Sequence, residues 1–359
     1  MADILDFLKE LISAPGLSGR EDPVAGLIAE KWRPLVQEIH TSRLGSLHGL
    51  CTGNAPAPRP SVMVATHMDA IGLMVRDVQE GFLHVTGVGG VDHRLLPGQL
   101  VKVHASGKGR NQELTGVVAL PHPSLLPAQI GSDPVPLEHL LVDLGLPSRM
   151  VNDRVRVGDA ISFATPPTDL SGDALAGHSL DNRASVAALT VCLEELHRLQ
   201  HAWDVWAVAT VQEENGLKGA YTSAYELLPS FAIVIDVSYG KGPGAGDWNT
   251  FPIGEGPTLV CGPNIHPAAH RLFKKLADEL EIPHAIEITP RHSGTDAFAV
   301  QVTASGIPCM VLGIPLRYMH SPVEVVVIRD IQRTGRLVAE FISRLDQDFI
   351  NQLAWESGS

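Results

Sequence analysis

The chain has 359 residues, of which 44% are hydrophobic and 19% charged, a composition typical of a folded globular protein large enough for two domains. Its formal net charge is −13 at pH 7 and it has no cluster of Lys and Arg, which argues against nucleic acid or an anionic membrane as a partner. No uninterrupted apolar run approaches the roughly 20 residues that a membrane span requires.

The first predicted elements are two helices and a strand. Residues 3–13 carry apolar side chains at helical spacing, and the pattern stops at Ala14-Pro15-Gly16. A second helix is predicted from about Pro23 to Trp32, and residues 61–66 (SVMVAT) form an apolar strand that leads directly to His67-Met68-Asp69. The N-terminus has no basic segment before an apolar stretch, so we expect no signal peptide and a cytoplasmic protein.

The four cysteines lie far apart and include no C-x-x-C pair. This spacing favours reduced, packed thiols over a zinc ribbon or a disulfide framework.

The pattern changes to short β-like runs from about Gly72 to Phe163, with Gly and Pro between them. Helical periodicity nearly vanishes here, apart from a short helix expected around Leu137 to Leu144. We therefore predict an inserted all-β domain at residues 72–163, with residues 1–71 and 164–359 forming an α/β domain. The predicted strands are GLMVRDV, FLHVTGV, QLVKVHA, ELTGVVAL and DRVRVGDAISF.

An α/β pattern returns after Pro166. Asp181 stands at the start of a clear amphipathic helix, a place where an Asp is often only an N-cap. The predicted strands are 204–212, 231–238, 285–289 and 308–314, and the predicted helices are 184–199, 221–228, 268–280, 296–304 and 328–345.

Polar side chains recur where the apolar strands end. Residues 206–220 (WAVATVQEENGLKGA) lead from a buried strand to Glu213 and Glu214, which on their own could be a solvated strand end or the first turn of a helix. The carboxyl ends of parallel strands lie at one edge of a sheet, so such residues converge in space. The other strand-end residues are His67, Asp69, Asp236 and His320.

Two histidines with several carboxylates and no sulfur predict a metal site that suits zinc, cobalt or manganese. Two divalent ions carry +4, and Asp181, Glu214 and Asp236 carry −3, so a bridging hydroxide would complete neutrality. Such a site produces a hydrolytic nucleophile at neutral pH.

Two further roles follow from the spacing. Asp69 lies two residues after His67, so in an extended chain its carboxylate can orient the imidazole. One of the paired glutamates, Glu213 or Glu214, would act as the general base, and spacing alone leaves the choice open.

Five segments together resemble the M42 family of co-catalytic metallo-aminopeptidases, which includes tetrahedral and glutamyl aminopeptidases. They are ATHMDAIGLMV, SLDNRAS, VQEENGLKGA, VIDVS and PLRYMHSPVEVV. The resemblance runs from SAPGLSGRE to HSPVE. It implies a phosphorylase/hydrolase-like catalytic domain, with a central mixed sheet flanked by helices, and a PDZ-like or barrel-like dimerisation insert.

The resemblance also implies a set of metal ligands for two ions in each subunit. By this likeness His67 and Asp236 hold one ion, Glu214 and His320 hold the other, and Asp181 bridges both.

By the same likeness Glu213 is the general base and Asp69 the orienting carboxylate of an enzyme that releases N-terminal amino acids from short peptides. An N-acyl amino acid deacylase, or another hydrolase on the same metal pair, is the alternative. Family members assemble from dimers into tetrahedral dodecamers, which implies a homo-oligomer. The sequence departs from the family pattern at Asn215 and at His292-Ser293, and the second departure leaves the preferred N-terminal residue open.

Overall fold

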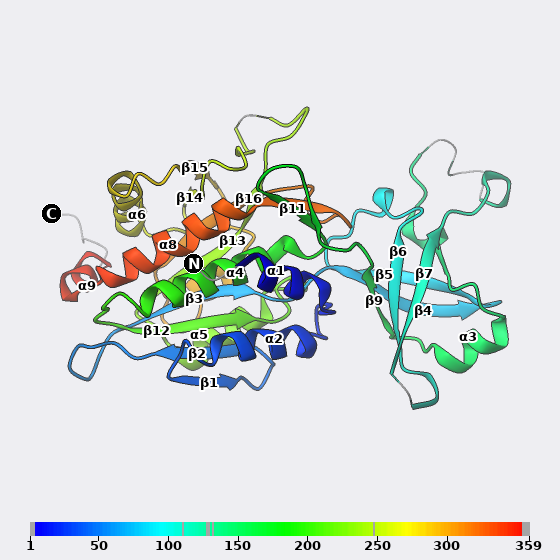
Figure 1. Cartoon of the computed structure of the whole chain (residues 1–359), viewed down its shortest axis with the longest axis horizontal. Helices are drawn as coiled ribbons and strands as arrows, with labels where there is room; N and C mark the ends of the chain where they lie inside the picture. The colour runs from blue at the N-terminus through cyan, green and yellow to red at the C-terminus, as the bar shows by residue number, and fades with distance from the viewer. Residues whose placement is uncertain (1–3, 110, 127–129, 131–132, 247, 354–359) are drawn as a thin grey trace.

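The chain folds into an α/β body with a β-barrel at one side (Figure 1). This computed structural model describes residues 4–353, apart from 110, 127–129, 131–132 and 247. Within this described part, every helix is too short or too polar to serve as a membrane span.

The α/β body is built on an 11-stranded mixed sheet. Its path runs β1-β2-β12-β3-β13-β16-β17-β11-β10, and β14 pairs with β16 and with β15 off this path. The strands are β1 (Glu38–Thr41), β2 (Leu47–Cys51), β3 (Ser61–His67), β10 (Thr168–Asp169), β11 (Ala174–Gly177), β12 (Asp204–Thr210), β13 (Phe231–Tyr239), β14 (Thr258–Cys261), β15 (Ala285–Ile288), β16 (Cys309–Arg317) and β17 (Glu324–Val327).

Four neighbouring strands, β12, β3, β13 and β16, are parallel and form the centre of this sheet. Their side chains are almost all buried, which explains why each reads as a continuous apolar run rather than an alternating one. Their parallel direction brings the carboxyl ends of all four strands to one edge.

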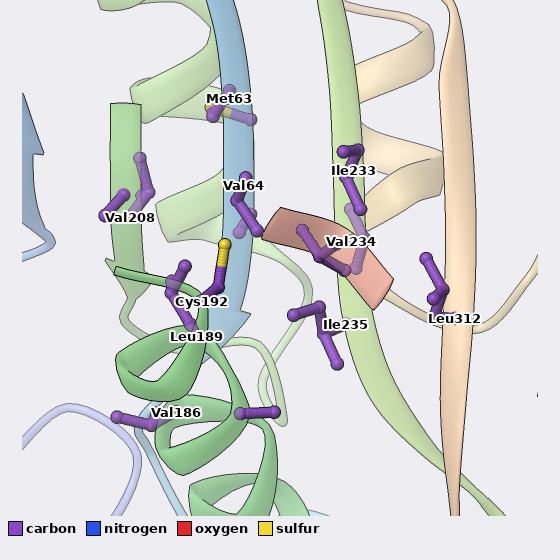
Figure 2. Packing of buried hydrophobic residues seen from close by; sticks show 14 of the residues in the cluster. Met63, Val64, Val186, Leu189, Cys192, Val208, Ile233, Val234, Ile235 and Leu312 are labelled. Carbon is purple, nitrogen blue, oxygen red and sulfur yellow. The ribbon is translucent and has the colours of Figure 1, made fainter. Parts of the chain in front are cut away.

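Helices cover both faces of the sheet. Helix α4 contacts β3 and β13 and is in turn covered by α1, α2 and α8, while α5 and α7 contact each other and β3 on the other face. Figure 2 shows Leu189 and Cys192 of α4 lying over Val64 of β3 and Val208 of β12. The helices are α1 (Ile4–Ser13), α2 (Asp22–Trp32), α3 (Ser148–Arg154), α4 (Leu180–Leu196), α5 (Lys218–Leu227), α6 (Pro267–Glu279), α7 (Asp296–Gln301), α8 (Ile328–Ser343) and α9 (Gln347–Leu353).

The barrel is closed in the order β4-β5-β8-β7-β6-β9 and has a hydrophobic core separate from that of the α/β body. Closure leaves no free strand edge, because every strand pairs on both sides. The strands are β4 (Gly72–Gln79), β5 (Phe82–Val88), β6 (Leu100–Ala105), β7 (Gln112–Ala119), β8 (Leu141–Asp143) and β9 (Ala160–Phe163), and the short 3-10 helices are η1 (His93–Leu95), η2 (Gly107–Gly109), η3 (Pro123–Leu125) and η5 (Leu137–His139).

The predicted fold class, an α/β body with a mixed sheet and an inserted β-barrel, is confirmed. The helix expected around Leu137 to Leu144 is wrong, because the segment forms the short η5 and then β8, which closes the barrel between β5 and β7. The strand expected from Asp153 begins only at Ala160, and Asp153 itself belongs to α3, which ends at Arg154. The β1–β2 hairpin was not predicted.

Candidate active site

Four of the candidate residues lie where the central strands reach the carboxyl edge of the sheet. His67 is the last residue of β3 and pairs in register with Thr210, the last residue of β12. Glu213 and Glu214 follow β12 in a turn. Asp236 was predicted to end its strand, but β13 continues to Tyr239, so Asp236 lies within the strand near its end.

Asp181 occupies the centre of the site. Its carboxylate oxygens face two histidines rather than the backbone N–H groups of α4. Asp181 and Asn182 have non-helical backbone angles, and the peptide bond between them is cis. Asp181 Oδ1 lies 3.2 Å from His67 Nε2, and its Oδ2 lies 3.2 Å from His320 Nε2. One carboxylate therefore faces two histidines, one at the end of β3 and the other in the turn after β16.

Two more carboxylates complete the arrangement. Asp236 Oδ1 lies 3.9 Å from His67 Nε2, and Glu214 Oε1 lies 3.7 Å from His320 Nε2. Ligand atoms of His67, Asp181 and Asp236 all lie within 4.8 Å of one another, as do those of Asp181, Glu214 and His320. The predicted residues are thus brought together as two triads that share Asp181.

These triads fit divalent cations in both chemistry and charge. Burial, the largest effect, and neighbouring carboxylates together raise the pKa of Asp236 to about 8 and that of Glu214 to about 7, against the opposing effect of the histidines. Hydrogen bonding to Asp181 raises the pKa of His320 to about 9. Three buried carboxylates need more positive charge beside them than two imidazoles carry. Divalent ions bound by nitrogen and oxygen ligands would supply that charge.

Glu213 lies at the rim of the first triad. Its Oε2 is 4.0 Å from His67 Nε2, and its side chain is about 10% exposed. Burial, the largest effect, and the charge of Asp236 raise the pKa of Glu213 to about 10, against the opposing effect of His67. A carboxyl group whose proton affinity is raised in this way is suited to accept and return a proton.

Asp69 is fully buried and connects three parts of the site. Its Oδ1 accepts a hydrogen bond from the backbone N–H of Glu213 at 3.0 Å, and its Oδ2 accepts one from Glu214 at 3.2 Å. Oδ1 also lies 3.5 Å from His67 Nδ1, and the backbone oxygen of Asp69 lies 3.2 Å from the same nitrogen. The carboxylate therefore fixes the glutamate turn as well as the imidazole.

Three buried charged residues around the site were missed as site residues in the sequence. Glu324 accepts hydrogen bonds from the backbone N–H groups of Asp181 (3.0 Å) and His320 (3.2 Å). Asp296 accepts one from Thr210 Oγ1 at 2.5 Å. A single carboxylate within the apolar strand β17 was the available signal for Glu324, whereas the turn before α7 suggested only a helix cap.

Arg183 is the third of these residues. It donates hydrogen bonds to the backbone oxygens of Leu11, Ala14 and Met68, so it joins the end of α1 to the segment between His67 and Asp69. Burial lowers the pKa of Arg183 to about 10, which still leaves it charged at neutral pH. The motif SLDNRAS contained Arg183, but nothing in its spacing showed what the side chain contacts.

The barrel also contributes to the site through the segment after β5. A Cβ atom added to Gly90 would lie 2.8 Å from His320 Nδ1, and one added to Gly89 would lie 3.1 Å from Glu214 Oε2. Gly89 has φ +75°, a conformation that favours glycine. The backbone of this segment therefore lies directly against the second triad.

Clustered histidines and carboxylates at the carboxyl edge of an α/β sheet define a metal-dependent hydrolase. Residues 45–337 match the M42 glutamyl aminopeptidase family, and the chain belongs to that family. It is 33% identical to a lysyl aminopeptidase of Pyrococcus furiosus over 95% of this chain and 97% of that protein.

Solved structures agree with this family. A TET aminopeptidase from a marine sediment archaeon of the Thaumarchaeota superposes with a TM-score of 0.91 at 29% identity, over 98% of this chain and 99% of that one. The TET1 peptidase of Pyrococcus horikoshii, described as assembling into a tetrahedron or a large octahedral shell, gives 0.80 at 27% identity, over 96% and 100%. The predicted metal-dependent aminopeptidase is confirmed, and the deacylase alternative is not favoured.

Proposed function

We propose that this aminopeptidase uses two divalent ions, one held by His67, Asp181 and Asp236 and the other by Asp181, Glu214 and His320. The observation that supports this is the position of Asp181, whose two oxygens each lie 3.2 Å from a different histidine. Zn²⁺ suits these ligands best, and Co²⁺ and Mn²⁺ suit them as well.

When bound, such ions act as Lewis acids towards the first peptide carbonyl and make water a stronger acid. Glu213 takes the proton from the attacking water and delivers it to the departing amine. Asp69 holds Glu213 in place by accepting its backbone N–H, and Glu324 does the same for Asp181 and His320. The substrates are short peptides with a free N-terminus.

We also propose that residues 72–163 form a dimerisation domain, while residues 1–71 and 164–359 form the catalytic domain. The separate core of the barrel supports this division. The tetrahedral assembly of the Pyrococcus horikoshii relative supports a homo-oligomer built from dimers, with a dodecamer as the expected form. The four free cysteines agree with the cytoplasmic location expected from the sequence.

The test combines substrate, metal and the proposed base. Leu-, Glu- and Lys-p-nitroanilides should be hydrolysed, chelation should abolish the rate, and added zinc, cobalt or manganese should restore it. Glu213→Gln should bind metal normally yet lose about 100- to 10,000-fold in kcat, whereas the exposed Glu255→Gln should be unaffected. An unchanged rate in Glu213→Gln would eliminate the proposed base, and cleavage of N-blocked aminoacyl amides would favour a deacylase.

A further inference from the structure

A second cluster of metal-ligating side chains lies away from the active site, at the outer edge of the large sheet. His40 of β1 and His48 of β2 stand directly opposite each other in an antiparallel pair, and Glu226 reaches them from α5. One ligand atom from each of the three residues lies within 4.8 Å of the others.

Two separations within this cluster match those of ligands that share a metal ion, and the contact between His40 and His48 also has the geometry of a long hydrogen bond. His40 Nε2 lies 3.3 Å from His48 Nδ1 and 3.5 Å from Glu226 Oε1. Hydrogen bonds of this type are usually about 2.7–3.2 Å long. Two ligands bound to zinc at about 2.0–2.1 Å in a tetrahedral site lie about 3.3–3.4 Å apart.

His48 is already arranged as a ligand. Its ring is fully buried, its Nδ1 faces His40, and its Nε2 lies 2.9 Å from the hydroxyl of Ser223. When the hydroxyl accepts a hydrogen bond from Nε2, the lone pair is left on Nδ1, which is how metal-binding histidines are usually oriented.

The other two residues leave the site accessible. The side chains of His40 and Glu226 are 44% and 47% exposed, so an ion can enter from solvent and keep a water molecule as its fourth ligand. The Glu226 carboxylate supplies a negative charge beside the two imidazoles. The ring of Trp206 packs edge-on against His40, with centroids 6.0 Å apart, and restricts the movement of that imidazole.

We propose that His40, His48 and Glu226 bind one divalent transition-metal ion, with Zn²⁺ as the best match, at a site separate from the catalytic centre. Two imidazoles and one carboxylate are a known zinc ligand set. The bound ion joins the β1–β2 hairpin to α5, the helix that begins four residues after Glu214. Its role is to fix the edge of the sheet against the element that follows the catalytic turn.

The experiment counts metal and compares variants. The intact enzyme is saturated with zinc, freed of unbound ion by buffer exchange, and analysed for zinc per subunit by mass spectrometry. His40→Ala and Glu226→Gln should each bind one zinc fewer than wild type and keep full aminopeptidase activity. The matched controls His197→Ala and Glu38→Gln replace exposed residues outside the cluster and should bind the wild-type amount.

A titration gives a second measurement. Added zinc should raise the melting temperature of wild-type enzyme further than that of His40→Ala at equal concentrations, because binding to the folded state alone stabilises it. Equal zinc content in wild type, His40→Ala and Glu226→Gln would overturn the proposal. Loss of the same ion from the two control variants would overturn it as well. Neither outcome depends on the catalytic ligands, because activity is followed separately.

Discussion

Asp69→Asn is the most informative change near the site, because Asp69 supports the proposed base and ligands without being a proposed metal ligand itself. The two oxygens of the wild-type carboxylate accept the backbone N–H groups of Glu213 and Glu214. An Asn side chain has one oxygen and one NH₂ group, which only donates. Whichever way the amide turns, one backbone N–H meets another donor in a fully buried place.

The magnitude follows from those contacts. A hydrogen bond to a charged acceptor contributes about 1.5–3 kcal/mol, and an unsatisfied buried donor costs about 1–3 kcal/mol. If about 2–4 kcal/mol of this loss raises the activation barrier by displacing Glu213 and Glu214, kcat/KM falls about 30- to 1,000-fold, because each factor of ten corresponds to about 1.4 kcal/mol. The weaker support of His67 should also lower metal affinity by about 10- to 100-fold.

The assay measures Leu-p-nitroanilide hydrolysis over a range of zinc concentrations, together with zinc content after dialysis. Excess zinc should restore occupancy but only part of kcat, because the base remains misplaced. Asp348→Asn, an exposed Asp to Asn change in α9, is the matched control and should leave both quantities unchanged. A folded Asp69→Asn enzyme with wild-type kcat/KM and zinc affinity would refute the reasoning.

Three further outcomes test other parts of the structure. Gly90→Ala should lower kcat/KM at least ~10-fold, because its Cβ would lie 2.8 Å from His320 Nδ1 and force that ring to move. Gly87→Ala, whose nearest neighbour would be 3.8 Å away, is the control, and equal rates would contradict the contact. Burial, assisted by the charge of Arg183, lowers the pKa of His178 to about 3, so below about pH 6.5 the unfolded chain takes up a proton that the native state does not. The contribution of His178 to stability is therefore fully present above pH 6.5 and is lost as the pH drops, which removes about 2 kcal/mol between pH 7 and pH 5. Urea unfolding should show that the free energy of unfolding of His178→Gln falls about 2 kcal/mol less than that of wild type between pH 7 and pH 5. A difference between the two proteins that does not change with pH would disprove this role of His178. Removal of metal by chelation should lower the melting temperature, and an unchanged melting curve would argue against ions bound in the folded core.

Much of the site was predictable because the central strands are parallel. Their apolar runs are visible in the sequence, and a parallel arrangement brings the residues that follow them to one edge. This is why the sequence predicted a meeting of His67, Glu214 and His320, although more than a hundred residues separate each from the next. All three do lie near Asp181. The β-rich segment was recognised for a similar local reason, since its runs are short and separated by Gly and Pro.

The unpredicted parts depend on contacts that local patterns do not encode. Arg183 donates to backbone oxygens far away in the chain, and Glu324 accepts from the distant backbone N–H of Asp181 as well as from His320, so no periodicity identifies either residue. The β1 strand, EIHT, is mostly exposed and too short for a clear alternation. Helix η5 and strand β8 have the apolar spacing of a helix, but closing the barrel requires a strand between β5 and β7.

The barrel contacts the catalytic body at the active site as well as through the chain segments that connect the two domains. Gly89 and Gly90 bring backbone from the barrel against Glu214 and His320, and a side chain at either position would lie too close to the second triad. The geometry of that triad therefore depends on how the barrel sits on the α/β body. Since the same barrel is the proposed dimerisation domain, assembly and catalysis meet at this segment. A change that shifts the barrel should disturb His320 before it disturbs His67, which is held by Asp69 within the body.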